Sequence, residues 1–532
     1  MAHLLYSLLP TFLVFLVVIF TKRLPLALML GSLLGALLAT SGSIPASLKL
    51  LVRRLREAAD LDSLFLYGFL FVLGILITLI EHSGGIAWCA QWLLTKLKSK
   101  RSAELISMAL SCSLSLDDYL SVLTTGAIMR PITDTMGIAR VKLAWLIHSL
   151  SGPIVILAPL SSWLVMITSQ LEQAGAKSSI SPDTKLLIDP YLLFLKSTPF
   201  ILYSILTFAS VFIIVWFKMS YGSMHIHEMN AQKTGTMRGN TKEIETTNSN
   251  HTPPTSLIHL IAPLLALMIT FIAGIAYNGG YDLLGGNNGF IAALKSTHHV
   301  SYILFASSVV ATLVSILLRM LDQRTRTYSL IRLAQFGVHI MAWSVLIVLL
   351  ASIFGAITRL DLHSGTYLAQ AFSRTMQPWL LPLATFAIST LAALTTGSAW
   401  GTIALLVPLA LQMTLSLSAV AGIATLDDVR LLLPVLGAVF SGAACGNHIS
   451  PIAETSTMSA TSAGCSLFDH VKTQVWYAIP AIIGTAAGFC VIGFLLLIYQ
   501  MSLAIALGIA MGVGLVVTIL SILLFSLFLK HD

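Results

Sequence analysis

Long apolar stretches recur along the whole chain, and they constrain its fold more than any other feature. Of its 532 residues, 56% are hydrophobic and only 10% are charged, whereas a soluble domain carries about 25% charged residues. A helix needs roughly 20 apolar residues to cross a bilayer, and we find no short alternating segments typical of a membrane barrel. We therefore expect an all-α polytopic membrane protein. Apolar stretches lie near residues 4–20, 24–40, 61–80, 102–125, 143–169, 190–217, 257–277, 300–319, 333–357, 375–396, 400–415, 430–446, 477–499 and 501–529.

Several of these stretches are too short or too interrupted to cross alone, so we expect about 11 to 13 transmembrane helices. The first stretch lacks a basic n-region and a clear cleavage site, which favours a retained span over a signal peptide. Residues 85–98 predict an interfacial helix. The Lys and Arg residues cluster between apolar stretches, as in loops that orient membrane helices. The net charge of +8 therefore indicates a lipid bilayer as partner and no nucleic acid.

One long segment, residues 218–256, is polar and ends in a double proline. This composition predicts a flexible linker. Its two histidines, His225 and His227, have no further ligands spaced around them, so a solvated linker is preferred to a metal site. The five cysteines show no CxxC spacing and are expected to be small core residues.

The two sides of this linker resemble each other. Asp117-Asp118-Tyr119 corresponds to Ser398-Ala399-Trp400 at an offset of 281 residues. The same offset relates His82-Ser83-Gly84 to His363-Ser364-Gly365. The identities are few, so chance is the alternative, but internal repeats with broken helices are typical of secondary transporters. The expected organisation is an N-terminal helical hairpin (1–60), a first transporter repeat (61–217), the polar linker (218–256), connecting helices (257–332), a second repeat (333–499) and a C-terminal transmembrane helix (500–532).

Two adjacent carboxylates, Asp117 and Asp118, lie inside an apolar stretch, where a charge costs about 2.5–3.5 kcal/mol or more. On a regular helix adjacent side chains point about 100° apart, so both could not face one ion. One acid would then face a cavity while the other pairs with an Arg or caps a helix. Alternatively, the serine-rich run before them breaks the helix and aims free backbone groups into the site. A third interpretation makes Asp117 a helix cap at the membrane surface.

Two further stretches combine glycines and hydroxyls in apolar surroundings. Residues 395–408, TTGSAWGTIALLVP, predict either a loosened helix beside a ligand or close helix packing. Residues 441–464, SGAACGNHISPIAETSTMSATSAG, predict an irregular or re-entrant segment, or else a loop outside the membrane. Their oxygens suit a small hard cation, and histidines beside them either titrate near neutral pH or are satisfied core residues. The candidate cation- and proton-binding residues are Asp117, Asp118, Ser398, Thr402, Asn447, His448, Ser450 and Glu454, with Tyr119, Arg130, Asp134, His148, Ser149 and Trp400 as supporting residues.

Specific motifs occur in a fixed order along the chain. They are DDY (117–119), MRPITD (129–134), KLA (142–144), PLSSW (159–163), TGSAWGT (396–402), SG (441–442), GNHISP (446–451), GC (464–465) and DHV (469–471). In this order they resemble the NhaC family of sodium/proton antiporters, in the ion-transporter superfamily, over about residues 60–490 without the linker. The resemblance implies Na⁺ as the transported metal ion, held at Asp117, Asp118 and Asn447. It also implies no cofactor and a multi-pass protein of a bacterial inner membrane.

The sequence departs from the family at three positions. His148 and Asn447 each stand where the family usually has Asp, and Ala453-Glu454-Thr455 replaces its Ser-Asp-Thr. Carboxylates are thus lost at two positions and lengthened at a third, while Asp117 and Asp118 remain. Sodium selectivity and the exchange ratio therefore stay open, as does the exchange of organic acids that some relatives carry out.

The residues suggest a mechanism of exchange. Burial raises the pKa of a carboxylate and a bound cation lowers it, so a cavity acid can hold a proton or a cation in turn. With alternating access, this competition becomes antiport. We expect Asp118 to be the shared acid, with Asp117 an almost equal choice, and Arg130 to pair with Asp134 or Asp117.

Other functions remain as alternatives. The first is a Na⁺- or H⁺-coupled transporter of a small organic acid or amino acid, whose carboxylate would meet helix N-termini and His148 or Arg130. An intramembrane enzyme is not expected, because neighbouring acids cannot face each other as an aspartyl protease requires. The internal duplication favours a carrier over an ion channel. A homodimer is left open.

Overall fold

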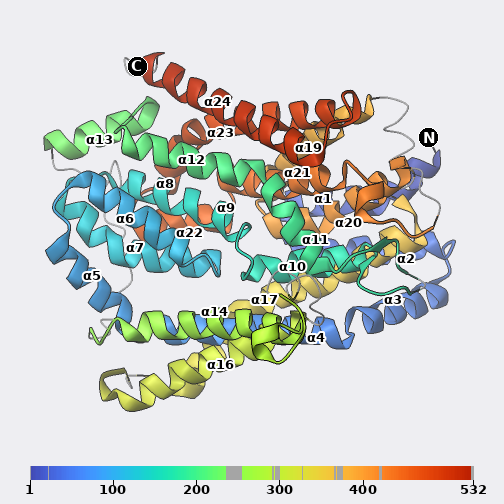
Figure 1. Cartoon of the computed structure of the whole chain (residues 1–532), viewed down its shortest axis with the longest axis horizontal. Helices are drawn as coiled ribbons and strands as arrows, with labels where there is room; N and C mark the ends of the chain where they lie inside the picture. Colours follow the sequence, from blue (N-terminus) through green and yellow to red (C-terminus); the bar gives the residue numbers. More distant parts are fainter. Residues whose placement is uncertain are drawn as a thin grey trace. The chain divides into compact units, whose positions relative to one another are not determined.

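The protein is almost entirely helical, as Figure 1 shows. The structure, a computed structural model, describes residues 2–21, 23–181, 183–234, 254–289, 293, 300–325, 328–364, 367, 376–418 and 422–528. Within these ranges nine helices are long and apolar enough to cross a membrane, and the pair Pro190–Phe200 and Leu202–Trp216, bent by 46°, would make a tenth span. The chain is therefore a multi-pass all-α membrane protein, as the sequence predicts.

The number of long apolar helices is lower than the 11 to 13 crossings expected, because two predicted spans are broken. Residues 102–125 divide into α6 (Lys100–Ser113) and α7 (Asp118–Thr135). Residues 143–169 divide into α8 (Arg140–Leu150), α9 (Gly152–Val155) and α10 (Ser162–Gln173). In each stretch the residue just before a new helix, Asp117 before α7 or Ser161 before α10, has a side-chain oxygen that accepts hydrogen bonds from backbone N–H groups in the first turn of that helix.

Side-chain caps explain these helix starts. The Asp117 carboxylate accepts from the backbone N–H groups at the start of α7, and the Ser161 hydroxyl accepts from Leu164 N at the start of α10. Ser99 and Ser102 form a capping box at the start of α6. Each cap satisfies backbone donors that a helix end would otherwise leave without partners.

The chain forms two compact units. The larger unit comprises residues 1–54, 98–244 and 350–532. Besides α6 to α10 it contains α1 (Ala2–Thr21), α2 (Leu24–Ala39), most of α3 (Ile44–Ala58), a two-stranded parallel sheet of β1 (Ala176–Lys177) and β2 (Leu186–Leu187), α11 (Pro190–Ser197), α12 (Leu202–Trp216), α13 (Gly222–Thr234), α19 (Leu381–Thr396), α20 (Ala399–Ser418), α21 (Leu432–Ile449), α22 (Glu454–Ala463), α23 (Leu467–Leu497) and α24 (Leu503–Phe528).

Small residues let the helices of the larger unit approach closely. A methyl group on Gly446 of α21 would overlap the backbone of Thr390 in α19, and one on Gly484 of α23 would overlap that of Gly514 in α24. Helix pairs in membranes commonly associate through such residues, because van der Waals contact replaces the hydrophobic effect there.

The smaller unit comprises residues 55–97 and 245–349. Gly74 of α4 packs closely against Gly337 of α17, and a methyl group on Gly74 would overlap the backbone of Gly337. The predicted interfacial segment 85–98 does form a helix, α5, with Trp88 and Trp92 stacked. The helices of this unit are α4 (Leu61–Glu81), α5 (Gly85–Lys96), α14 (Ile258–Asn278), α16 (Val300–Leu321) and the greater part of α17 (Leu330–Ala356).

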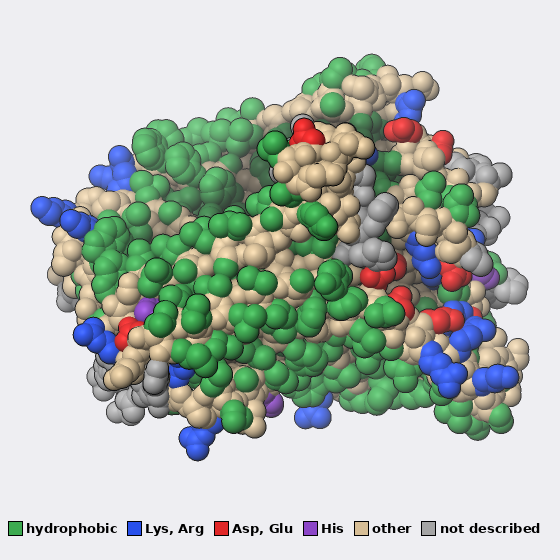
Figure 2. Space-filling model, turned by 60° about the horizontal axis from the view of Figure 1, so that its bottom comes forward, with side chains coloured by type: hydrophobic (Ala, Val, Ile, Leu, Met, Phe, Trp, Pro, Cys, Tyr) green, Lys and Arg blue, Asp and Glu red, His purple; other side chains and the backbone are tan. Residues whose placement is uncertain are grey.

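The surface suits a lipid environment. Hydrophobic side chains cover much of the face drawn in Figure 2. Along α24, Leu520, Leu524 and Phe528 are all exposed, as expected of a helix that faces acyl chains.

The polar segment predicted as a linker is in part helical. Helix α13 begins at Gly222, whose φ of +57° turns the chain, and residues 223–234 contain no Gly or Pro that would interrupt a helix. Residues 235–253 lie outside the described residues. The compact units also cut across the predicted first repeat, since residues 61–97 and 98–217 fall in different units. Compactness reflects packing rather than sequence repetition, so the repeat boundaries stay predictions.

Candidate functional site

The paired acids of the first half lie at the break between α6 and α7. Asp117 precedes the helix with extended backbone, and its Oδ1 accepts hydrogen bonds from the N–H groups of Tyr119 (2.9 Å) and Leu120 (3.2 Å). Asp118 is the first residue of α7, and both acids are buried. Of the interpretations left open, the broken helix is confirmed. Asp117 is indeed a cap, but the cap is inside the protein.

The start of α10 lies against this break. Ser162 N donates to the carbonyl oxygen of Leu116, 2.9 Å away. The Ser162 hydroxyl lies beside Asp117, and the Trp163 indole lies beside Asp118. Ser162 Oγ and Trp163 Nε1 are buried, and neither forms a well-aligned hydrogen bond within the described part of the chain. Two buried polar groups are thus available beside two buried carboxylates.

A third acid reaches this cluster from the second half. Glu454 begins α22, and its Oε2 accepts a hydrogen bond from the Tyr119 hydroxyl at 2.5 Å. The Glu454 side chain is exposed, in contrast to the two aspartates, and it is close enough to act electrostatically on Asp118. We call Asp117, Asp118 and Glu454, with Tyr119 between them, the carboxylate cluster.

The segment 441–464 is more regular than predicted. Helix α21 continues to Ile449, and only residues 450–453 interrupt it before α22. Irregular backbone is therefore limited to residues 450–453, and the residues on both sides of the break are helical, in contrast to the irregular segment expected. In α21 the small residues pack against α19 instead. The break itself falls at Ser450, ahead of Pro451, since a residue before proline disfavours helical backbone.

Asn447 joins this break to the one between α19 and α20. Its Nδ2 donates to the carbonyl oxygen of Gly397 (3.1 Å), and its Oδ1 accepts from the Thr455 hydroxyl (2.9 Å). The Ser450 hydroxyl donates to Leu394 O at 2.9 Å. Both predicted oxygen ligands thus serve contacts between helix ends.

Ser398 and Thr402 mainly satisfy their own helix. Ser398 Oγ accepts from Gly401 N at 3.0 Å, and the Thr402 hydroxyl donates to Ser398 O at 2.9 Å. Trp400 is half-buried in the same turn. Ser398 nevertheless occupies the position that the 281-residue offset pairs with Asp117, and each of the two residues caps the helix that follows it. The correspondence between the halves therefore extends to how these helices start.

Three buried histidines come together next to the carboxylate cluster. His148 Nδ1 lies 3.0 Å from His470 Nε2, and His148 Nε2 lies 3.2 Å from the Thr455 hydroxyl. The rings of His148 and His448 are 4.9 Å apart. Thr455 follows Glu454 directly, so the first turn of α22 connects the carboxylates to the histidines.

His448 makes the remaining contacts of this histidine network. Its Nδ1 lies 2.6 Å from the Tyr203 hydroxyl, and its Nε2 lies 3.1 Å from Ser149 Oγ and in contact with the Gln474 amide. Tyr203, His470 and Gln474 were not among the residues predicted for the site. His470 lies in the quoted DHV motif, and Ser162 and Trp163 lie in PLSSW, so a sequence signal existed for these three. No sequence motif indicated Tyr203 or Gln474.

Asp134 and Arg130 lie at the far end of α7 from Asp118. Asp134 forms a two-pronged ion pair with Arg140, through Nε at 3.0 Å and Nη2 at 2.7 Å. Arg140 also donates to Gly464 O at 3.3 Å, and the guanidinium of Arg130 lies against Gly464. These residues therefore tie the ends of α7 and α22 together.

The carboxylate and hydroxyl oxygens of the site are donors of the type that suits a small hard cation. Carboxylate and hydroxyl oxygens are the ligands that such cations prefer. In the described ranges no group of three or more His, Cys, Asp or Glu side chains is arranged to hold a metal ion.

A sequence profile of the Na⁺/H⁺ antiporter family matches residues 154–494. An uncharacterised protein of Haemophilus influenzae is 29% identical over 499 residues, covering 92% of this chain and 91% of that protein. The malate-2H⁺/Na⁺-lactate antiporter of Bacillus subtilis is 29% identical over 121 residues, 23% of each chain.

Two solved transporter structures are also similar. The Alcanivorax borkumensis YdaH transporter gives a TM-score of 0.49 at 14% identity, covering 84% of this chain and 91% of its own. The Neisseria gonorrhoeae MtrF efflux pump gives a TM-score of 0.46 at 15% identity, covering 86% and 85%.

Proposed function

Because this chain belongs to the Na⁺/H⁺ antiporter family and is a secondary transporter, we propose that it exchanges Na⁺ for protons at the carboxylate cluster. The family consists of antiporters, and the relative that is similar over 121 residues is an antiporter as well, which supports transport rather than catalysis. The proposed exchange depends on how the acids are placed.

The observation that carries the proposal is the burial of Asp117 and Asp118 at a helix break. Taking two carboxylates out of water is costly unless a proton or a cation neutralises them. Either species can do so, but the two compete for the same oxygens. An acid that must be neutralised, and can be neutralised in two ways, has the property that exchange requires.

Asp118 is the better candidate for the shared acid. Asp117 Oδ1 already accepts two backbone hydrogen bonds, so this side chain has a structural role at the start of α7. Asp118 does not cap the helix, and it lies beside Trp163 and within the electrostatic reach of Glu454. Glu454 is exposed and is suited to pass cations or protons between the buried acid and the surroundings.

The proposal can be tested in proteoliposomes loaded with a pH-sensitive dye. Asp117→Asn and Asp118→Asn are compared with the parent for proton movement on adding Na⁺, Li⁺ or K⁺. Asp427→Asn is the matched control, because Asp427-Asp428 is an adjacent acid pair in an exposed turn. We expect Asp118→Asn to abolish exchange and the control to retain it. Parent-like exchange by both Asp117→Asn and Asp118→Asn would exclude the mechanism.

A second candidate is coupled transport of a small organic acid. His470 Nδ1 and Gln474 Oε1 are buried, and neither has a hydrogen-bond partner among the described residues. Such groups suit a polar substrate, and the similarity to a malate/lactate antiporter covers 121 residues. Proton movement driven by Na⁺ without any organic acid present favours the first proposal, whereas a strict requirement for lactate or malate favours the second.

A further inference from the structure

A polar cavity lies outside the site described above. It has a volume of about 730 Å³, and none of its lining residues belongs to the carboxylate cluster or the histidine network. The cavity is formed by the start of α6, one residue of α8, the turn after α12 and one face of α13. Its lining residues are Ser99, Lys100, Arg101, Glu104, Lys142, Lys218, Ser220, His225, Glu228, Met229 and Gln232.

A buried ion-pair triad forms the floor of this cavity. Lys142 Nζ lies 2.8 Å from Glu104 Oε1 and 2.6 Å from Glu228 Oε1. The side chains of Lys142 and Glu104 are each only 5% exposed. Removing charges from water is repaid only when they are paired closely, so the triad fixes α13 against α6 and α8.

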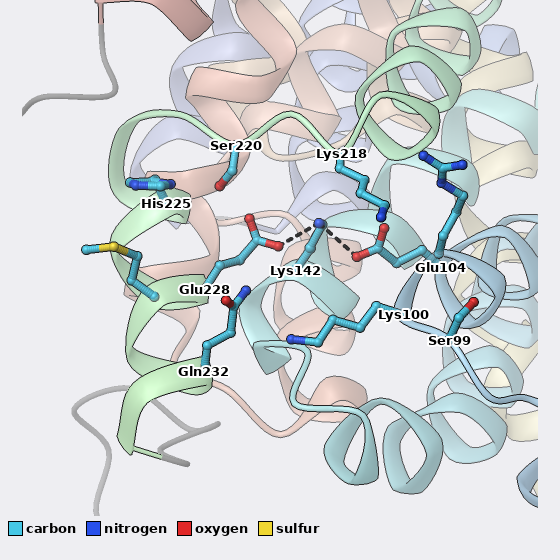
Figure 3. A pocket seen from close by; sticks show the side chains of 11 residues that line it. Ser99, Lys100, Glu104, Lys142, Lys218, Ser220, His225, Glu228 and Gln232 are labelled. Atoms are coloured by element: carbon cyan, nitrogen blue, oxygen red, sulfur yellow. Dashed lines mark hydrogen bonds and ion pairs between the residues drawn. The ribbon is translucent and has the colours of Figure 1, made fainter.

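The remaining lining charges are positive. Lys100, Arg101 and Lys218 add to Lys142, so four basic side chains face two carboxylates, an excess of two positive charges. Figure 3 shows the amino groups of Lys142 and Lys218 near each other, while Lys100 crosses the lower part of the cavity and its Nζ donates to the carbonyl oxygen of Gly137 at 3.1 Å. Lys218 has no ion-pair partner among the described residues, and its φ of +54° is uncommon for a residue other than glycine.

Two of these basic residues lie at the N-terminal end of a helix, where positive charge is unfavourable. Lys100 and Arg101 occupy the first turn of α6, which contains no acid. The N-terminal end of a helix carries partial positive charge and stabilises anions. Cations there raise the local positive potential further, and a bound anion would relieve it.

From this arrangement we propose that the cavity binds a ligand through a phosphate group. A phosphate dianion matches the excess of two positive charges, and amino and guanidinium groups are its usual partners. The volume lies within the range of about 300–1,000 Å³ for small-molecule sites, so the phosphate is carried on a larger molecule. Ser220 and Gln232 supply neutral hydrogen-bond donors around it.

The phosphate has two sources, an anionic lipid headgroup or a soluble phosphate compound. Arg101 lies over the ring of Trp216, with its Cζ 5.5 Å from the ring centre, and both Trp216 and Phe217 are exposed. Exposed aromatic residues at the end of an apolar helix are typical of the membrane interface. The cavity is therefore accessible in principle to both sources, and the experiment separates them.

The test uses the full-length protein in detergent and native mass spectrometry with titrated probes. The probes are dihexanoyl phosphatidic acid, with dihexanoylglycerol as its phosphate-free control, and ADP, with adenosine as its control. The variant is Lys100→Gln combined with Lys218→Gln, which leaves the buried triad intact. Lys196→Gln is the matched control, since Lys196 is exposed and does not line the cavity. The thermal midpoint without probe checks that each variant is folded.

We expect saturable binding of one phosphate probe, weakened about tenfold or more in the double variant and unchanged in Lys196→Gln. Binding of phosphatidic acid alone identifies a lipid headgroup, and binding of ADP alone identifies a soluble ligand. The proposal is overturned if no phosphate probe binds saturably, or if the folded double variant binds as tightly as the parent.

Discussion

The hydroxyl of Tyr119 donates a 2.5 Å hydrogen bond to the carboxylate of Glu454. These residues are 335 positions apart in the chain, and each lies in the first turn of a helix that follows a break. The bond brings the helix starting at Asp118 next to the helix starting at Glu454, so carboxylates from both halves of the chain share one site.

Removing this bond should weaken the site more than the fold. In Tyr119→Phe we expect a loss of stability below about 1.5 kcal/mol, because Glu454 is exposed and water can replace the phenol. Transport should fall substantially. A double-mutant cycle with Glu454→Gln measures the link: the two changes should be non-additive by about 0.5 kcal/mol or more in the free energy of unfolding. Strictly additive effects would show that the residues do not interact.

Asp117 combines a cap with a charge, and two substitutions separate these roles. Asn is as good a cap as Asp, so Asp117→Asn should retain the stability of α7, whereas Asp117→Ala should cost about 1 kcal/mol. Thermal or denaturant unfolding of both variants checks this. Equal stability of Asp117→Asn and Asp117→Ala would contradict the capping role.

The contact of His148 with His470 should be sensitive to polarity rather than to size. His470→Phe leaves the buried Nδ1 of His148 without a partner and should destabilise the protein by about 1–3 kcal/mol. His470→Gln, which can hydrogen-bond, should recover part of the loss. If His470→Phe and His470→Gln unfold at the same denaturant concentration, the hydrogen bond carries no stability.

Close packing of α19 and α21 makes Gly446 intolerant of a side chain. A methyl group there would overlap the backbone of Thr390, and such overpacking costs about 1–3 kcal/mol. Gly512 of α24 has no atom near its missing Cβ, so Gly512→Ala is the control and should gain up to about 1 kcal/mol from helix propensity. Equal yields and thermal midpoints for the two variants would count against the packing described for α21.

Much of the fold could be predicted from the sequence, because apolar length alone identifies spanning helices. Helix breaks were harder to place. The run SCSLSLDD showed that a break was one of several possibilities, but only the Asp117 cap and the Ser162–Leu116 contact decide between them. In 441–464 the small residues indicated irregular backbone, whereas most of them serve to pack α21 against α19.

The residues of the candidate site could be predicted only in part. A charge in an apolar stretch is visible in a sequence, so Asp117, Asp118 and Glu454 could be selected. Tyr203 and Gln474 could not, because a single polar residue in a helix shows nothing about which distant side chain it meets. Ser398 and Thr402 were selected for their oxygens, and their own backbone satisfies those oxygens.

Competition between the two ions predicts a specific pH dependence. Protons neutralise the shared acid as the pH falls, so the apparent KM for Na⁺ should rise, by up to about tenfold per pH unit when one proton competes with one cation. At high pH the KM should reach a plateau while the maximal rate falls for lack of protons. Initial rates of Na⁺ uptake between acidic and alkaline pH check this. A KM independent of pH would show that the two ions do not share a site.

The most direct measurement is proton release when Na⁺ is added to the purified protein in weakly buffered detergent solution. Sharing of one acid predicts that Na⁺ binding releases protons in proportion to the sodium bound, that Asp118→Asn abolishes the release, and that Asp427→Asn does not. Sodium binding to the parent without proton release, or undiminished release from Asp118→Asn, would contradict the account.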